Sequence, residues 1–515
     1  MKYLKKFETE NDRTSYENGE SYIEPYVSYV EGDNSVHYNK PPETRLVAKF
    51  NVSSTTNPTI IAYYSYVSGF SKVEIDGVEQ PNVVSAYTFD TLGEHTVKYT
   101  LRDETSINER VFYDYCKGLT SVSIPNSVIT IGREAFRDCS SLTSVTFGNN
   151  VEVIGYSAFG GCPLTSVTLP DSLTTISGGS FYGCSFSSIN IPSNVTFINT
   201  DSFSSAALTS ITVDSNNSVY DSRDNCNAII ETASNKLFIG CSNTIIPNTI
   251  VTIGNTAFAN CNGLTSITIP DSVTTLENNA FFYCTNLASI YIGSGVTSLT
   301  VDCFTQCTAL TSITIDSNNV VYDSRDNCNA IIETASNTLK KGFSTTIIPN
   351  TITTIGVSAF TYNYNITSVT IPDSVTRIGA SSFRSCIGLT SVTIGSRVTN
   401  IDASAFAECY KLTTITIPDS VTSIGSSAFT SCTGLTTVTI GSGVTSIGQS
   451  TFRGCRGLQT ITSLATTAPS VSNKTFQDVK TSGTLYVPQG STGYDTWMQN
   501  ANYYLGLYNW TKVEQ

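Results

Sequence analysis

The chain has 515 residues, a formal net charge of −13 and only 13% charged residues, which describes a surface rich in Ser, Thr, Asn and Tyr. This acidic balance argues against nucleic acid as a partner, because counterion release needs clustered basic residues. No run of about 18 apolar residues is present, so neither a membrane span nor membrane insertion is predicted.

The N-terminus, MKYLKKFETENDRTSYENGESY, carries lysines but lacks the apolar stretch of a secretory signal. Three interpretations stay open: export by another route, a signal removed earlier, or assembly inside a cell.

Residues 1–40 are predicted to form a separate attachment segment. The stretch YIEPYVSYVEGDNSVHYN is expected to form two short strands around Gly32 and Asp33. It resembles the N-terminal segment of virion and tail proteins of phages that infect gut Bacteroides-type bacteria, and this resemblance implies a virion attachment end. The alternatives are a flexible leader and a strand that pads the next domain.

Residues 41–110 change to a period-two alternation of apolar and polar residues, which predicts a small β-sandwich. An Asp76-Gly77 hairpin turn is expected within one of its strands. The predicted strands are 45–52, 59–66, 72–80, 86–89 and 95–101. No Pro, Gly or Ser-rich linker follows, so we expect a stiff junction with the next domain.

A phenylalanine then recurs at steps of mostly 23 residues, with a few steps of 22 or 24. A fixed period of about 20 to 29 residues indicates a leucine-rich-repeat solenoid. The phenylalanines are Phe112, Phe136, Phe159, Phe181, Phe203, Phe258, Phe281, Phe304, Phe360, Phe383, Phe406, Phe429 and Phe452. The predicted fold is mainly β, with about 13 coils of 22–24 residues over residues 111–457 after the small β-sandwich.

Within each unit the spacing L-x-x-V/I-x-I, as in Leu264, Ile267 and Ile269, predicts a strand with apolar residues inward and Ser or Thr outward. A turn, a short apolar pair and the motif A-F-x-x-C complete the coil. A single coil has only half a core, so the coils must stack and the ends must be capped. Residues 458–515 are the predicted C-terminal cap.

The unit ITSVTIPDSVTRIGASSFRSC resembles the BspA-like, or Treponema-type, leucine-rich repeat, over roughly residues 105 to 515. The resemblance implies a right-handed binding solenoid of the kind found mostly on bacterial surface proteins. The tail resembles the common ending of this family, which implies that a strand near Leu485 and a short aromatic helix close the last coil. The resemblance implies no catalytic residue.

Two near-identical insertions, near 213–245 and 315–347, expand one unit each and are expected to bear a β-hairpin. Their aspartates suggest a calcium loop, but the spacing does not match an EF-hand and ordinary turn chemistry is favoured. Arg223 and Arg325 are expected to pair with these carboxylates, so no metal is predicted.

Most of the fifteen cysteines occupy one slot, three residues after the repeat phenylalanine. Ala206 and Asn363 fill the same slot in other coils, which a disulfide framework would not tolerate. Free buried thiols are therefore predicted rather than disulfides or metal ligands.

No catalytic constellation is recognisable. The chain has two histidines and lacks G-x-S-x-G, a phosphate loop and H-E-x-x-H. A glycosidase-like carboxylate pair is not excluded, but none stands out from the turn aspartates. The sequence therefore predicts a protein that is not an enzyme and has no cofactor.

Aromatic and basic residues beside A-F-x-x-C vary from coil to coil and form the candidate binding surface. Exposed aromatics and arginines commonly anchor interfaces, although turn tyrosines that merely cover neighbouring coils are the alternative. The set is Tyr113, Tyr115, Tyr156, Tyr182, Tyr283, Tyr362, Tyr364, Arg384, Tyr410, Arg453 and Arg456.

Two functions are consistent with these patterns. The first is a phage virion protein that presents the solenoid to a bacterial surface glycan or protein and contacts other virion proteins through residues 1–110. The second is an extracellular bacterial cell-surface adhesin that binds host or neighbouring-cell proteins or glycans. The virion location predicts a homo-oligomer, whereas an adhesin can be monomeric.

Overall fold

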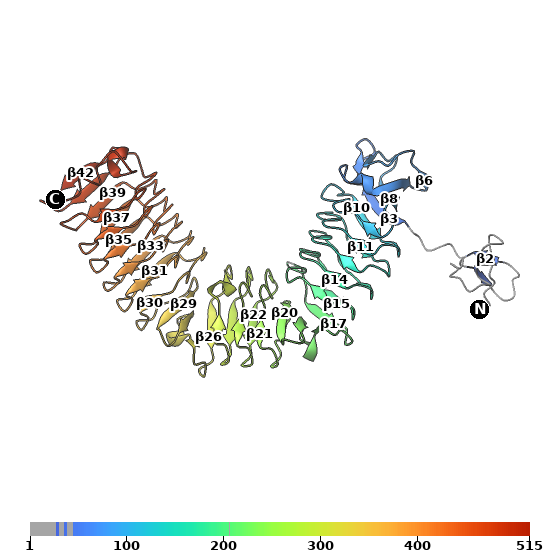
Figure 1. Cartoon of the computed structure of the whole chain (residues 1–515), viewed down its shortest axis with the longest axis horizontal. Helices are drawn as coiled ribbons and strands as arrows, with labels where there is room; N and C mark the ends of the chain where they lie inside the picture. Colours follow the sequence, from blue (N-terminus) through green and yellow to red (C-terminus); the bar gives the residue numbers. More distant parts are fainter. Residues whose placement is uncertain (1–26, 30–35, 39–44, 205) are drawn as a thin grey trace, which may run out of the picture. The chain divides into compact units, whose positions relative to one another are not determined.

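The computed structural model describes residues 27–29, 36–38, 45–204 and 206–515. The chain divides into two compact units: Met1–Phe186 with Asn194–Ser202, and Ser187–Ser193 with Phe203–Gln515. Figure 1 shows the coils of each unit following one another in chain order. Among the described residues, no helix has the length and apolar character needed to cross a membrane.

Two short strands lie in the N-terminal segment. β1 (Val27–Tyr29) pairs antiparallel with β2 (Val36–Tyr38), as the alternation of this stretch predicts. The expected turn at Gly32 and Asp33 and the rest of segment 1–40 lie outside the described residues.

The next strands form a six-stranded sheet in the order β12-β10-β3-β8-β5-β6. Its strands are β3 (Leu46–Val52), β5 (Phe70–Ile75), β6 (Val78–Glu79), β8 (Gly93–Leu101), β10 (Leu119–Ser123) and β12 (Ser144–Thr146). β3 pairs antiparallel with β10, and β10 pairs parallel with β12. The sheet therefore runs without a break from the predicted sandwich strands into the first coils.

A second ladder is formed by β4 (Thr59–Ile60) and β7 (Ala86–Tyr87). A hydrogen bond of 2.5 Å connects it with the six-stranded sheet, because the buried Tyr99 hydroxyl of β8 donates to the Ile61 carbonyl just after β4. The predicted strand 59–66 is wrong beyond Ile60. Tyr63 N–H donates instead to the Val111 carbonyl of the first coil, and the chain turns into the 3-10 helix η1 (Val67–Gly69).

Each solenoid coil contributes a short strand, and most also contribute a longer one, to parallel ladders. In the first unit the short strands are β9 (Ser106–Ile107), β11 (Thr130–Ile131), β13 (Val153–Ile154), β14 (Thr175–Ile176) and β16 (Phe197–Ile198). In the second unit they are β21 (Thr252–Ile253), β23 (Thr275–Leu276), β25 (Ser298–Leu299), β30 (Thr354–Ile355), β32 (Arg377–Ile378), β34 (Asn400–Ile401), β36 (Ser423–Ile424), β38 (Ser446–Ile447) and β40 (Ser470–Val471).

Most of the longer strands of the second unit alternate exposed and buried residues, as the L-x-x-V/I-x-I spacing predicts; in β22, for example, Ser266 and Thr268 are exposed and Ile267 and Ile269 are buried. These strands are β15 (Ser188–Ile191), β17 (Ser210–Val213), β22 (Ser266–Ile269), β24 (Ser289–Ile292), β26 (Ser312–Ile315), β31 (Ser368–Ile371), β33 (Ser391–Ile394), β35 (Thr414–Ile417), β37 (Thr437–Ile440), β39 (Thr460–Ser463), β41 (Thr484–Val487) and β42 (Thr511–Glu514). The observed architecture is the mainly β, leucine-rich-repeat solenoid that the sequence predicts.

The repeat phenylalanines stack on one another and form what we term the phenylalanine ladder. Ring centres of successive coils lie 4.7–6.0 Å apart, and their planes are within 10° of parallel. The ladder runs one coil further than the sequence indicates, because Phe476 stacks on Phe452. In this coil Val479 occupies the position that is Cys in most other coils, so the repeat was not recognised in the sequence.

The cysteine slot lies beside the ladder. In most coils the thiol donates a hydrogen bond of 2.9–3.5 Å to the phenylalanine carbonyl of the preceding coil, as Cys386 does to Phe360. All fifteen cysteines are free, and all except the half-buried Cys261 are buried, so the predicted free thiols are confirmed. Burial raises the pKa of the Cys455 thiol to about 12.

Each insertion replaces one coil with an antiparallel hairpin, β19 (Ala228–Glu231) with β20 (Lys236–Gly240), and β28 (Ala330–Glu333) with β29 (Thr338–Gly342). The next phenylalanine ring lies directly over the last glycine of the hairpin. A Cβ on Gly342 would lie 2.1 Å from a ring carbon of Phe360, so no other residue fits. The smaller elements of the insertions are β18 (Tyr220–Asp221), η2 (Arg223–Asn225), β27 (Tyr322–Asp323) and η4 (Arg325–Asn327), and η3 (Val301–Phe304) precedes the second one.

The C-terminal residues close the second unit. The Trp497 ring lies 5.4 Å from Phe476, and its Nε1 donates a 3.0 Å hydrogen bond to the Pro469 carbonyl. The expected aromatic helix is the single 3-10 turn η5 (Leu505–Tyr508). Trp497 thus covers the phenylalanine ladder, which would otherwise end on exposed apolar surface.

Candidate functional site

The turn around each repeat phenylalanine displays the candidate residues. Its backbone is left-handed two residues before and two residues after the ring in most coils, and Ser, Asp, Asn and Gly usually occupy these positions. Tyr283 and Tyr362 are exceptions, with φ of 58° and 60°. A bulky residue in this conformation costs about 1–2 kcal/mol.

In the first unit, three predicted tyrosines join a cluster with a residue of the N-terminal sheet domain. The Tyr115 ring stacks on Tyr63 at 5.1 Å, and Tyr113 lies 6.2 Å from Tyr63. Tyr156 lies one coil beyond Phe136, with Arg133 5.1 Å from its ring. Tyr115 and Tyr156 keep 50% and 46% of their surface exposed, so the cluster presents flat aromatic faces to solvent.

Arginines surround these rings and are fixed by one buried carboxylate. Arg110 and Arg137 lie 5.9 and 5.8 Å from the Tyr113 ring centre, within the range of a cation–π contact. Glu134, whose side chain is 4% exposed, accepts from Arg110 at 2.6 Å and pairs with Arg133 and Arg137 at 3.3 Å. Burial raises the pKa of Glu134, but the hydrogen bonds and charges of Arg110 and Arg133 outweigh it and hold the pKa below its ordinary value.

Tyr182, in the coil of Phe181, is exposed and makes no ring contact with the tyrosines of the cluster among the described residues. The remaining predicted residues belong to the second unit. Of the predicted residues in the first unit, Tyr113, Tyr115 and Tyr156 therefore share one cluster, and Tyr182 is not part of it.

In the second unit, Tyr362 meets Tyr364 edge to face with ring centres 6.5 Å apart, and its backbone N–H donates to the Arg384 carbonyl of the next coil. Arg384 pairs with Glu408 at 3.0 Å, and Tyr410 lies exposed in the coil of Glu408. Tyr283 contacts Phe282 in an earlier coil. Arg453 and Arg456 are exposed and form no ion pair within the described part of the chain.

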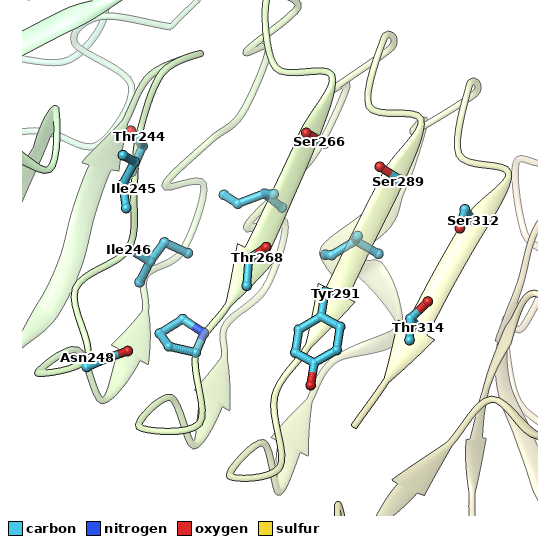
Figure 2. Close-up of a pocket in the computed structure, with 13 residues that line it drawn as sticks. Thr244, Ile245, Ile246, Asn248, Ser266, Thr268, Ser289, Tyr291, Ser312 and Thr314 are labelled. Atoms are coloured by element: carbon cyan, nitrogen blue, oxygen red, sulfur yellow. The ribbon is translucent and has the colours of Figure 1, made fainter. Parts of the chain in front are cut away.

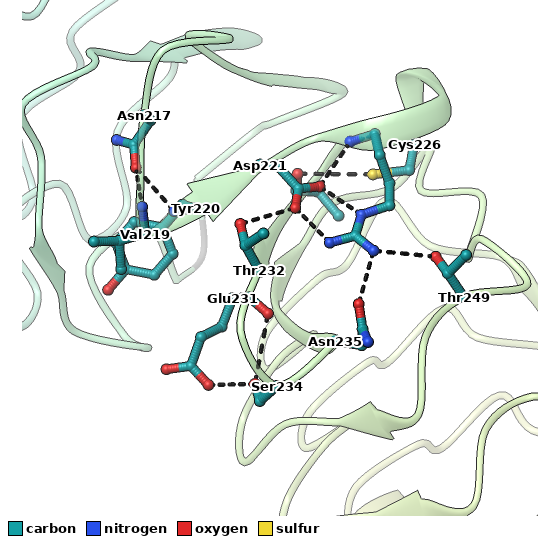
Figure 3. Close-up of polar contacts among 12 residues, drawn as sticks. Asn217, Val219, Tyr220, Asp221, Cys226, Glu231, Thr232, Ser234, Asn235 and Thr249 are labelled. Atoms are coloured by element: carbon teal, nitrogen blue, oxygen red, sulfur yellow. Dashed lines mark hydrogen bonds and ion pairs between the residues drawn. The ribbon is translucent and has the colours of Figure 1, made fainter.

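The insertions hold a different set of polar contacts, shown for the first one in Figure 3. Arg223 donates to both carboxylate oxygens of Asp221 and to Asn235 at 2.7 Å. Arg325 repeats these contacts with Asp323 and Asn337. The predicted arginine–aspartate pairs are confirmed, and in the residues described, no group of three acidic, His or Cys side chains is placed to hold a metal ion.

A groove of about 520 Å³ that the sequence analysis missed lies over the outward face of β22, β24 and β26 (Figure 2). The parallel register sets Ser266, Ser289 and Ser312 in one row and Thr268, Tyr291 and Thr314 in the next. Exposed Ile245 of the first insertion forms another wall.

All side chains that line this groove are uncharged. The Tyr291 hydroxyl donates to Asp316, which fixes the ring. The signal in the sequence is the tyrosine of SIYI, where most repeats have SITI or SVTI.

Stacked coils with L-x-x-V/I-x-I strands and a phenylalanine ladder define a leucine-rich-repeat protein. Residues 105–229, 231–362 and 353–482 match the family model described as BspA type leucine rich repeat region. The matches cover more than half of the chain, which therefore belongs to this family.

No curated protein matches the sequence. Among solved structures, the chain is similar to a leucine rich cell surface protein from Faecalibacterium prausnitzii, with 29% identity over 71% of this chain and 84% of that one, and a TM-score of 0.39. It is also similar to a leucine-rich repeat protein from Eubacterium ventriosum, with 24% identity over 64% and 90% of the chains and a TM-score of 0.42. The chain is also similar to the pneumococcal vaccine antigen PcpA, with 18% identity over 81% of this chain and 86% of that one, and a TM-score of 0.37.

Replacing Glu134 with Gln should lower the free energy of unfolding by about 2 kcal/mol at pH 7, because the buried partner of the arginines loses its charge. The folded-state pKa of Glu134 lies below the unfolded value of about 4.3. Its contribution is therefore present above that value and lost as the pH falls through the folded-state pKa. Thermal unfolding of the wild type and of Glu134→Gln, measured from pH 7 to pH 2.5, should show the difference in their stability shrinking as the pH falls. Glu152→Gln, at an exposed position, is the control. A stability difference between the wild type and Glu134→Gln that persists unchanged at acidic pH would contradict the assignment.

Proposed function

We propose that this chain is a non-enzymatic adhesion protein whose solenoid binds a bacterial, host or neighbouring-cell surface glycan or protein. The observation that carries the proposal is the aromatic–arginine cluster around Tyr115 and Tyr156, in which exposed rings are held rigidly and arginines are anchored by Glu134. Rigid aromatics beside arginine are the groups that supply most binding energy in protein interfaces.

We place the protein at the bacterial cell surface, because the BspA-like repeats imply such a location. The second candidate is the phage virion, which the resemblance of segment 1–40 favours. In that location residues 1–110 would contact other virion proteins, and the solenoid would still face a bacterial receptor.

The binding surface is tested by Tyr115→Ala and Tyr156→Ala in the full chain. Each should weaken binding to immobilised bacterial cell walls or to a glycan array by about tenfold or more, since loss of one anchoring aromatic removes about 2 kcal/mol. Tyr503→Ala is the matched control, because Tyr503 is also a tyrosine with 40% exposure but lies in the C-terminal cap. Equal binding by all three variants and the wild type would exclude this surface.

The location is tested by immunogold labelling of envelope fractions and of phage particles from a producing culture. The cell-surface proposal predicts label on the envelope in cultures without particles. Label confined to particles, and lost on deletion of residues 1–40, would replace it with the virion location.

A further inference from the structure

The second insertion interrupts the phenylalanine ladder and leaves a small cavity there. Phe304 does not stack on Phe360; it meets Phe343 edge to face with ring centres 6.3 Å apart. The cavity measures about 20 Å³, room for about one water-sized group such as a single carboxylate oxygen. Its polar lining comes from Gln306, Lys341, Thr361, Tyr362 and Asn363.

Lys341 is the unusual member of this lining. It is only 4% exposed, and it makes no side-chain hydrogen bond or ion pair with any residue that the structure describes. Burial lowers its pKa, opposed by the Cys303 thiol, by Asp302 and by two further thiols. No group in the described part of the chain pairs with its ammonium, so water or a ligand group that enters the cavity has to offset the cost of nearly burying the charge.

The first insertion supplies an internal comparison, because the two copies align without gaps. Lys341 corresponds to Ile239, which is equally buried at 5%, while Thr361 and Tyr362 correspond to Ala259 and Asn260. An apolar residue therefore satisfies this position of the fold. The second copy has acquired a lysine and a strained tyrosine at the same place.

Two other groups of the lining are already engaged. Thr361 donates to the Ser381 carbonyl, and Cys307 donates to Phe281. The lining contains no carboxylate. The cavity thus presents a cation without a counter-charge, which suits an anionic group that enters from outside.

Tyr362 lies at this cavity with 39% of its surface exposed and Tyr364 beside it. Two exposed rings offer flat faces to a ligand, while the backbone N–H groups of Tyr362 and Asn363 are bonded within the protein and cannot pair with a peptide. These features favour a sugar ring over a peptide as the body of the ligand.

We propose that this cavity binds the carboxylate of an acidic sugar, with the Lys341 ammonium as its partner and the Tyr362 ring against the sugar. The inference rests on the proposed binding function only for its biological setting.

The test uses the full chain and glucuronate as the probe, with glucose and sodium chloride at equal concentration and ionic strength as controls. Glucuronate should raise the melting temperature of the wild type in a saturable manner, and neither control should do so. Lys341→Ile, which copies the first insertion, should weaken the response by about tenfold or more, as loss of a hydrogen bond to a charged group requires. Tyr362→Asn should weaken it by a smaller factor.

Without ligand, Lys341→Ile should melt at a higher temperature than the wild type, because a buried amine is removed. Lys341→Met serves if the isoleucine variant does not fold. The proposal is overturned if Lys341→Ile responds like the wild type, if chloride stabilises equally, if glucuronate has no effect, or if an acidic peptide acts through Lys341 and glucuronate does not. Tyr115→Ala should respond to glucuronate as the wild type does, so failure of the adhesion surface and failure of this site are distinguishable.

Discussion

Contact between phenylalanine rings of successive coils is the interaction on which the rest of this protein depends. Within each uninterrupted run of coils a ring covers the one before it, and in most coils a cysteine thiol donates to the carbonyl of the preceding phenylalanine. A coil has too little apolar surface to fold alone, so its stability comes from the interfaces with its neighbours. This requirement explains the glycine beneath Phe360 and the tryptophan over Phe476.

The same stacking holds the turns of successive coils in place, so that variable side chains on these turns are presented to solvent. Because backbone bonds to the next coil fix the turn beside each ring, the side chains that follow the phenylalanine can vary without changing the fold. Tyr115, Tyr156 and Tyr362 occupy such places and remain exposed. Where the second insertion interrupts the ladder, the interruption leaves room for Lys341, a residue that the regular coils could not accommodate.

Local patterns in the sequence were sufficient to predict the repeat, the strands and the free thiols, since each depends on spacing within one coil. Phe476 was missed because Thr475 and Val479 replace the usual Ala and Cys around it. Residues 61–66 were predicted as strand because the period-two alternation was continued through them, yet a hydrogen bond to the distant Val111 carbonyl decides their conformation.

The candidate site was predictable only in part. The turn tyrosines could be recognised by their position, but the contact of Tyr63 with Tyr115 joins residues from different domains. Lys340 and Lys341 look alike in the sequence as neighbours on one strand. Lys340 reaches Glu333 at 3.6 Å, whereas Lys341 points to the other face and is buried. Only the register of the hairpin separates their roles.

The most direct test of this account is the reactivity of the thiols in the native protein, because the cysteines are buried beside the phenylalanine ladder. With a thiol reagent at neutral pH and no reductant, the native chain should react slowly, with the half-buried Cys261 first, and all fifteen thiols should react after unfolding. Fewer than fifteen thiols in the unfolded chain would reveal disulfides. Rapid reaction of many thiols in the native chain would contradict the stacked coils.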